Sequence, residues 1–343
     1  MSTSKQIILT SLLLFAGIAC ADSNIDTTKE DTITEDGAAS QVALTAALES
    51  SSPTVPTSPV EEETVKQIQA KYSSAETCTK IERKLGSVYP KDCEIGGLEI
   101  SGVSVKGTPI LVKEYPPVSS RKPLGRVLLV GGIHGDEYSS VSIVFAWMRK
   151  LNQFHSGMFH WKVVPLMNPD GLLRNKAQRM NDNGVDLNRN FPTPNWETES
   201  QKYWVERTKS NPRRYPGPTP LSEPESQWLA KLIKEFKPDA IVAVHAPYGI
   251  LDFDGPRTAP KRLGHLHLNL LGTYPGSLGN YAGVQNKIPV VTIELPYAGI
   301  MPTREQVSSI WVDMVGWLKK NMHTIPQEAS QGGSVESRVD ATS

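Results

Sequence analysis

Four short runs of aliphatic and β-branched residues set the strongest limit on how this chain can fold. They lie at residues 126–130, 161–166, 240–244 and 289–295, and each is largely apolar along its length rather than at alternate positions. A continuous apolar run is typical of a strand buried on both faces, as in a parallel sheet covered by helices. The sequence therefore predicts one α/β domain over residues 96–325, with a mixed, mostly parallel sheet flanked by helices.

Two helices of this domain have recognisable starts. Ser222-Glu223-Pro224-Glu225 and the segment 303–306 both have the pattern of a capping box, in which a hydroxyl and a carboxylate or amide satisfy the first backbone N–H groups. Apolar residues follow each start at helical spacing. We expect them to pack in the core: Trp228, Leu229, Leu232, Ile233 and Phe236 after the first start, and Val307, Ile310, Trp311, Met314, Val315 and Leu318 after the second.

The first 21 residues have the features of a secretory signal. Lys5 precedes an apolar segment at residues 7–18, which is too short to cross a bilayer and has the length of a signal's apolar core. Two endings remain open. Ala19-Cys20-Ala21 fits a cleavage site, whereas Cys20 also fits the lipidated cysteine of a bacterial lipoprotein, although Gly17 stands where such signals usually carry Leu. We expect an exported protein, either periplasmic or anchored to the membrane through Cys20.

The segments that flank the domain differ from it in composition. Residues 22–63 are rich in Ser, Thr, Asp, Glu, Ala and Pro, and residues 326–343 are small and polar, so we expect a flexible linker and a disordered tail. Residues 64–95 form a small N-terminal extension that contains Cys78 and Cys93. In an exported chain these two cysteines favour a disulfide bridge over two free thiols.

Polar residues stand where each of the four apolar runs ends. His134 and Glu137 follow the first run in the turn at residues 131–137, and Asn168-Pro169-Asp170-Gly171 follows the second. His245 ends the third run and Glu294 lies near the end of the fourth. Ligands of open α/β sheets bind outside the carboxyl ends of the strands. The sequence therefore predicts a functional site at this edge of the sheet.

Two of the polar side chains point to a metal centre. Of the seven histidines, His134 and His245 are the ones that directly follow buried strands. An imidazole at 134 and a carboxylate at 137 have a spacing that lets both reach one ion. Two His, one Glu and an open position for water are a common ligand set of catalytic zinc. These residue types at these positions favour a site for one Zn²⁺ over unrelated polar residues, and the motifs that follow decide between the two interpretations.

A set of motifs then resembles a known family. His134-x-x-Glu137, Asn168-Pro169-Asp170-Gly171, Arg179, Asp186-x-Asn188-Arg189, His245 and Thr292-Ile293-Glu294 occur in the order and approximate spacing of the M14 (carboxypeptidase A-like) zinc carboxypeptidases. The resemblance covers about residues 96–322 and implies a single carboxypeptidase-like domain. It also implies that His134, Glu137 and His245 are the zinc ligands.

The resemblance assigns further roles, residue by residue. Asp186 corresponds to the carboxylate that orients the first His ligand, and Arg179 to the residue that stabilises the oxyanion. Asn188 and Arg189 correspond to the clamp on the substrate's terminal carboxylate, and Glu294 to the general base. The family's mobile tyrosine has two candidates: Tyr274 and Tyr281 both precede Glu294, and Tyr274 is assigned either to substrate binding or to packing.

Three segments resemble the murein peptide amidase branch of that family, namely residues 186–196, 251–256 and 275–277. The resemblance implies hydrolysis of the bond between γ-D-glutamate and meso-diaminopimelate in cell-wall peptides. Three alternatives remain: a general carboxypeptidase acting on protein C-termini, an N-acyl amino acid deacylase, and a wall-binding homologue without catalysis. The balance of 36 basic and 36 acidic residues argues against a nucleic-acid partner. We expect a monomer with a murein peptide as its substrate.

Overall fold

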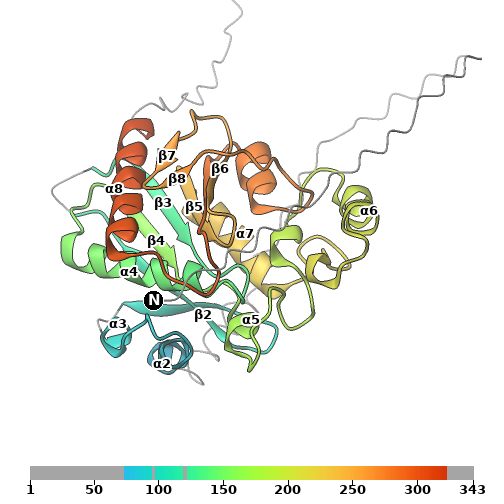
Figure 1. The fold of residues 1–343 in the computed structure, drawn as a ribbon, viewed down its shortest axis with the longest axis horizontal. Coiled ribbons are helices and arrows are strands. Elements are labelled where there is room, and N and C mark those ends of the chain that lie inside the picture. Colours follow the sequence, from blue (N-terminus) through green and yellow to red (C-terminus); the bar gives the residue numbers. More distant parts are fainter. Residues whose placement is uncertain (1–72, 95–96, 119–121, 323–343) are drawn as a thin grey trace, which may run out of the picture. The chain divides into compact units, whose positions relative to one another are not determined.

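The computed structural model describes residues 73–94, 97–118 and 122–322. The predicted signal at 1–21 with Cys20, the linker at 22–63 and the tail at 326–343 lie outside these ranges. The described residues build a seven-stranded sheet with helices on both faces (Figure 1). No helix among them is both long and apolar enough to cross a membrane.

The sheet has the order β1-β2-β4-β3-β5-β9-β6. Its central strands β4, β3, β5 and β9 are parallel, while β2 and β6 run in the opposite direction, so the predicted mixed sheet is confirmed. The strands are β1 (Leu98–Val103), β2 (Pro109–Tyr115), β3 (Arg126–Val130), β4 (His160–Val164), β5 (Ala240–His245), β6 (Ile250–Asp254) and β9 (Val290–Glu294). All four apolar runs of the sequence are central strands, as expected of strands covered on both faces.

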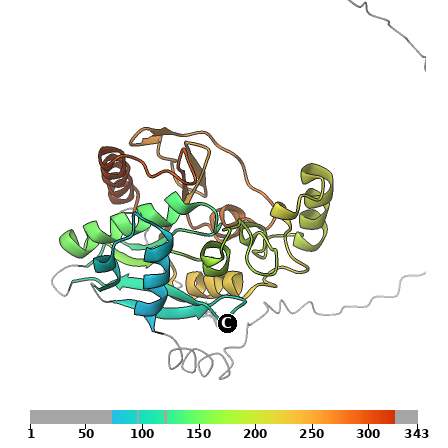
Figure 2. The same ribbon diagram turned by 60° about the horizontal axis from the view of Figure 1, so that its bottom comes forward.

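Two hydrophobic cores lie on opposite faces of the sheet because successive side chains of a strand point in opposite directions. On β3, Val127 and Leu129 belong to one core, and Leu128 and Val130 belong to the other. The first core is covered by α4 (Tyr138–Phe154) and α8 (Arg304–Asn321), and the second by α7 (Pro224–Phe236). Figures 1 and 2 show α4 and α8 on one side of the sheet and α7 on the other.

The two predicted capping boxes have different outcomes. The box at Thr303 is confirmed, because its hydroxyl accepts a hydrogen bond from Gln306 N and the Gln306 side chain accepts one from Thr303 N. The box at Ser222 is wrong: α7 begins at Pro224, with Glu223 as an N-cap residue that makes no side-chain cap bond. The Ser222 hydroxyl instead bonds the side chains of Asn190 and Glu223.

The N-terminal extension packs against the first core. Its described part contains α2 (Ser74–Lys84) and α3 (Pro90–Glu94), and a disulfide joins Cys78 to Cys93 across a sequence separation of 15. Cys78 and Ile81 of α2 are buried among the core residues. The bridge therefore connects two short helices that offer few apolar side chains of their own.

The remaining elements lie in the connections between the sheet strands and the long helices. They are α5 (Pro169–Leu173), η1 (Leu187–Arg189), α6 (Trp196–Thr208), η2 (Pro212–Arg214), β7 (Arg262–Leu263), β8 (Leu266–His267) and η3 (Gly279–Gln285). Figures 1 and 2 show α6 at the periphery, away from α4 and α8. These connections matter for function because several of them reach the carboxyl edge of the parallel strands.

Candidate metal centre and substrate cleft

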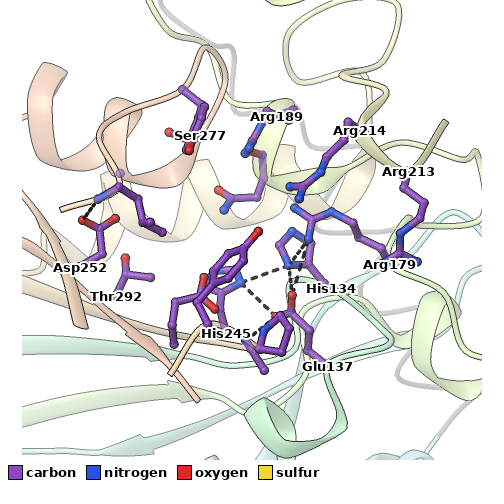
Figure 3. Close-up of a pocket in the computed structure, with 18 of the residues that line it drawn as sticks. His134, Glu137, Arg179, Arg189, Arg213, Arg214, His245, Asp252, Ser277 and Thr292 are labelled. Carbon is purple, nitrogen blue, oxygen red and sulfur yellow. Dashed lines mark hydrogen bonds and ion pairs between the residues drawn. The ribbon is translucent and has the colours of Figure 1, made fainter. Parts of the chain in front are cut away.

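Three side chains converge where β3 and β5 end. His134 and Glu137 lie in the turn after β3, and His245 is the last residue of the neighbouring parallel strand β5. His134 Nδ1 is 2.7 Å from Glu137 Oε1, and His245 Nδ1 is 3.1 Å from His134 Nδ1 and from Glu137 Oε2 (Figure 3). All three residues are buried, and one ligand atom from each lies within 4.8 Å of the others. They form a cluster with the geometry of a metal site.

Asp186 is fully buried behind this cluster and orients two of its neighbours. Its Oδ1 is 3.1 Å from His134 Nε2, and its Oδ2 accepts a 2.9 Å hydrogen bond from Arg179 Nε. Burial alone would raise the pKa of Asp186, but Arg179 and His134 outweigh it and hold the pKa well below its usual value. Asp186 therefore carries a negative charge at neutral pH.

Arg179 is held beside the cluster by the same carboxylate. Its Nη1 lies 3.2 Å from His134 Nδ1 and 3.6 Å from Glu137 Oε1. Burial lowers the pKa of Arg179, but Asp186 and Glu137 raise it by more. A permanent positive charge thus lies next to the point where the three side chains meet.

The chemistry of the donors suits a zinc ion. If His134 Nε2 donates its proton to Asp186, an assignment made from the bonding network, the Nδ1 lone pair faces the cluster. Burial opposes ionisation of Glu137, yet positive charge and hydrogen bonds from His134 and His245 keep its pKa far below the usual value, and a bound metal ion would replace those imidazole protons. Two neutral nitrogens and one carboxylate are the donors of many catalytic zinc sites. The His134–Glu137–His245 cluster could therefore hold one such ion.

Glu294 lies next to the cluster at the end of β9. It pairs with His245 in the register of the parallel strands β5 and β9. The side chain lines the cleft, the residue is 7 % exposed, and Oε2 has no hydrogen-bond partner within the described ranges. Burial raises the pKa of Glu294 above its ordinary value. A carboxylate with a raised pKa and a free oxygen is suited to proton transfer.

Arg189 brings a second buried guanidinium into the cleft. It ends η1, is 8 % exposed, and has an Nε that lacks a hydrogen-bond partner among the described residues. Its Nη1 donates a 2.5 Å hydrogen bond to the carbonyl of Asn188. Asn188 also lines the cleft, where its side-chain oxygen accepts a hydrogen bond from Leu278 N. A buried guanidinium with unused donors is suited to binding a carboxylate.

The two candidate tyrosines have different surroundings. Tyr274 lines the cleft, with its ring centroid 4.5 Å from Arg189 Cζ. Tyr281 instead stacks on Phe191, at a centroid distance of 5.6 Å, and packs against the core on the α7 side. Tyr274 is therefore the tyrosine that a substrate could touch.

Asn168 and Asp170, also named at a strand end, hold loops rather than facing the cleft. The Asn168 side chain caps α5 by accepting a hydrogen bond from Gly171 N, and it donates to the carbonyl of Arg179. Asp170 accepts hydrogen bonds from Lys106 N and the Thr108 hydroxyl.

Several lining residues had no assigned role in the sequence analysis. The cleft has a volume of about 590 Å³, and its walls include Asp252 and Asp254 from β6, Tyr203 from α6, and Arg214 from η2. Asp252 and Asp254 alternate with the buried Leu251 and Phe253, so a period-two pattern could have indicated that they share one face. The sequence around Arg214 carries no comparable signal.

Comparisons with known proteins agree with the geometry. The peptidase M14 family, described as zinc carboxypeptidase, matches residues 83–251. Murein peptide amidase A of Escherichia coli (strain K12) is 31% identical over 232 residues, covering 66% of this chain and 92% of that protein. Murein peptide amidase A of Vibrio campbellii is 32% identical over 202 residues, covering 57% of this chain and 77% of that protein.

Among solved structures, carboxypeptidase A from Helicoverpa armigera has a TM-score of 0.52 at 16% identity, with coverage of 76% of this chain and 79% of that chain. That structural likeness supports the carboxypeptidase-like fold.

Proposed function

The chain belongs to the zinc carboxypeptidase family, and from that premise we propose that it is a murein peptide amidase that cleaves γ-D-glutamyl–meso-diaminopimelate. The relatives named murein peptide amidase A support this choice of substrate. The observation that carries the proposal is the meeting of three kinds of group in one cleft: a ligand cluster, a free buried carboxylate at Glu294 and a buried guanidinium at Arg189.

The family membership and the positions of the residues in the cleft support the following roles. A zinc ion bound by His134, Glu137 and His245 would acidify a water molecule and polarise the scissile carbonyl. Glu294 accepts a proton from the attacking water and passes it to the leaving nitrogen. Arg179, fixed by Asp186, stabilises the negative charge that develops on the carbonyl oxygen.

The leaving residue is bound by its carboxylate and its side chain. Arg189 and Asn188 bind the terminal carboxylate, and the Tyr274 ring covers Arg189. Asp252 and Asp254 form a wall farther along the cleft and have no cationic partner among the residues that the structure describes. Burial, and then the charge of Asp252, raise the pKa of Asp254 to about 6. An ammonium group on the leaving residue would offset this repulsion, which supports a diamino acid at that position.

A substrate panel tests the proposal. The purified full-length chain, loaded with zinc, is incubated with L-Ala-γ-D-Glu-meso-diaminopimelate, with ordinary peptides that end in a free carboxylate, and with N-acetyl amino acids. We expect release of diaminopimelate from the first substrate at a kcat/KM at least tenfold above that for the others. Preferential cleavage of ordinary peptides would indicate a general carboxypeptidase, and preference for N-acetyl amino acids would indicate a deacylase.

The variant Glu294→Gln separates an enzyme from a binding protein. It keeps the size of the side chain but removes the proton acceptor, so turnover should fall by about 10²- to 10⁴-fold. Zinc content, measured by atomic absorption, should stay at one ion per chain because Glu294 is not among the three proposed ligands. Unchanged turnover in this variant would refute the assignment of Glu294 as the general base.

We also propose that the protein acts outside the cytoplasm as a monomer, with a cell-wall substrate within its reach. The Cys78–Cys93 bridge supports export, since structural disulfides persist in oxidising compartments. Mass spectrometry of the mature N-terminus separates cleavage after Ala21 from lipid attachment at Cys20. Size-exclusion chromatography measures the oligomeric state.

A further inference from the structure

Arg214 lines the cleft but has no part in the mechanism above. It is the last residue of η2 and is half-buried. Two other arginines of the cleft have carboxylate partners: Arg179 bonds Asp186, and Arg213 bonds Asp136. Arg214 has no acidic partner in the described part of the chain. Its positive charge is therefore available to a ligand.

The residues before and after Arg214 each bond a residue that adjoins the metal centre. Before it, Arg213 Nη1 lies 2.8 Å from an oxygen of Asp136, the residue that precedes Glu137. After it, the carbonyl of Tyr215 accepts a 2.8 Å hydrogen bond from Asp186 N. Because the loop is held at residues directly before and after it, Arg214 occupies a defined place relative to the ligand cluster.

Arg214 lies at the opposite end of the cleft from Asp252. Figure 3 shows Asp252 and Thr292 at one end of the pocket, and Arg213 and Arg214 at the other. The proposed function puts the side chain of the leaving residue at the Asp252 end. Arg214 therefore faces the part of the substrate that carries the scissile carbonyl, which is the acyl residue.

The charges around Arg189 indicate which kind of chemical group would bind beside Arg214. Burial lowers the pKa of the Arg189 guanidinium, the charge of Asp186 opposes that shift, and the positive charges of Arg179 and Arg214 lower the pKa further. One terminal carboxylate can occupy the Arg189 donors as a bidentate partner. A second anion beside Arg214 would offset the remaining repulsion between these cations, because Arg214 has no acidic partner within the described ranges.

A γ-glutamyl bond supplies such an anion. When glutamate is linked through its side-chain carboxyl, its α-carboxylate stays free on the acyl residue, whereas an ordinary peptide has no charge at that place. We propose that Arg214 is a specificity-determining residue that binds this carboxylate and so selects γ-linked acidic acyl residues. The inference rests on the proposed function and adds a residue that recognises the acyl residue of the same scissile bond.

Two substrates that differ at a single group test this inference. One is L-Ala-γ-D-Glu-meso-diaminopimelate, and the other carries a carboxamide in place of the free α-carboxylate of its glutamyl residue. Their leaving residues are identical, so a difference in kcat/KM reports on the acyl side alone. A hydrogen bond between charged groups predicts a preference for the carboxylate of about tenfold or more in the unmodified protein.

Variants assign the preference to one side chain. In Arg214→Gln the ratio of the two kcat/KM values should fall to about one, and Arg214→Lys should restore part of it, because a charge without the planar donor pair remains. Arg207→Gln is the matched control: it removes the same charge from an exposed position in the last turn of α6. It should keep the ratio of the unmodified protein. Zinc content and unfolding temperature are measured for each variant beforehand.

The outcomes separate this inference from the proposed function. Equal hydrolysis of both substrates by the unmodified protein would overturn the role of Arg214 while leaving the amidase activity standing. An equal loss on both substrates in Arg214→Gln would overturn it as well, and would assign Arg214 to the terminal carboxylate instead. Hydrolysis of neither substrate would overturn the proposed function and this inference together.

Discussion

Replacing Gly276 by alanine should damage substrate binding without touching the metal centre. Gly276 has a φ of +72°, and a Cβ built on it would lie 1.9 Å from the carbonyl oxygen of Arg189 and 2.7 Å from Trp196 Nε1. The glycine cannot move away freely, because its N–H donates to the Thr193 hydroxyl and its carbonyl accepts from Phe191 N. The strain must therefore be passed to the backbone of Arg189.

The expected size of the effect follows from these distances. Real Cβ contacts are essentially never shorter than 3.0 Å, so Arg189 and residue 276 must separate by about 1 Å. A displacement of about 1 Å in a substrate-positioning group can cost about 100-fold in rate. We expect kcat/KM on the murein tripeptide to fall by about that factor. The left-handed backbone and the overpacking together should cost about 2 to 4 kcal/mol of folding stability.

Steady-state kinetics, zinc titration and thermal unfolding measure these three quantities. The control is Gly107→Ala in the turn between β1 and β2, where φ is +75° and nothing lies within 4 Å of the added Cβ. Gly107→Ala should lose only the folding stability that backbone strain costs, about 1 kcal/mol, and its kcat/KM should be unchanged. The affinity of Gly276→Ala for zinc should stay within a few-fold of the unmodified protein, because neither Arg189 nor Trp196 belongs to the cluster.

Two results would refute this reasoning. If kcat/KM of Gly276→Ala matched that of Gly107→Ala, the position of Arg189 would not limit catalysis. If Gly276→Ala instead bound zinc more weakly, a shift of Arg189 would also disturb the metal centre. That result would contradict the contacts of Gly276, which reach Arg189 and Trp196 but none of the three ligands.

Three further outcomes are expected. Asp186→Asn, which keeps the shape but removes the charge behind His134, should weaken zinc binding by about 10- to 100-fold in chelator competition; unchanged affinity would contradict the orienting role. Reduction of the Cys78–Cys93 bridge should lower stability by about 3 kcal/mol in denaturant titrations, as its separation of 15 residues predicts. Burial raises the pKa of Glu225 to about 7, from 4.5, so the stability it contributes is complete below about pH 4.5 and is lost as the pH rises through 7. The fall in unfolding temperature between pH 5 and 8 should therefore shrink in Glu225→Gln, and an equal fall in both proteins would argue against that shift.

Three side chains in and beside the metal centre could be predicted because their positions follow from regular structure. His134, His245 and Glu294 stand at the ends of apolar runs, and parallel strands bring such ends to one edge of a sheet whatever the intervening loops do. The strands in turn can be recognised in the sequence from their apolar composition. Neighbouring residues thus carry enough information to place these three side chains together.

Other features depend on contacts between distant segments, which a local pattern does not contain. The capping box expected at Ser222 is absent because Asn190 engages that hydroxyl, while Glu225 bonds Asn181 and Val105 N instead of the helix start. Arg214 reaches the cleft because a loop of irregular backbone is fixed through its neighbours. Neither the contacts of Ser222 and Glu225 nor the position of Arg214 corresponds to a periodic pattern in the sequence.

The pairing of His245 with Glu294 across β5 and β9 has an evolutionary consequence. The spacing of these two groups is set by the hydrogen-bonded ladder, so substitutions in the loops leave it intact. A single-residue insertion or deletion within β9 would turn Glu294 to the opposite face and abolish activity at once. Insertions and deletions should therefore be purged from these two strands.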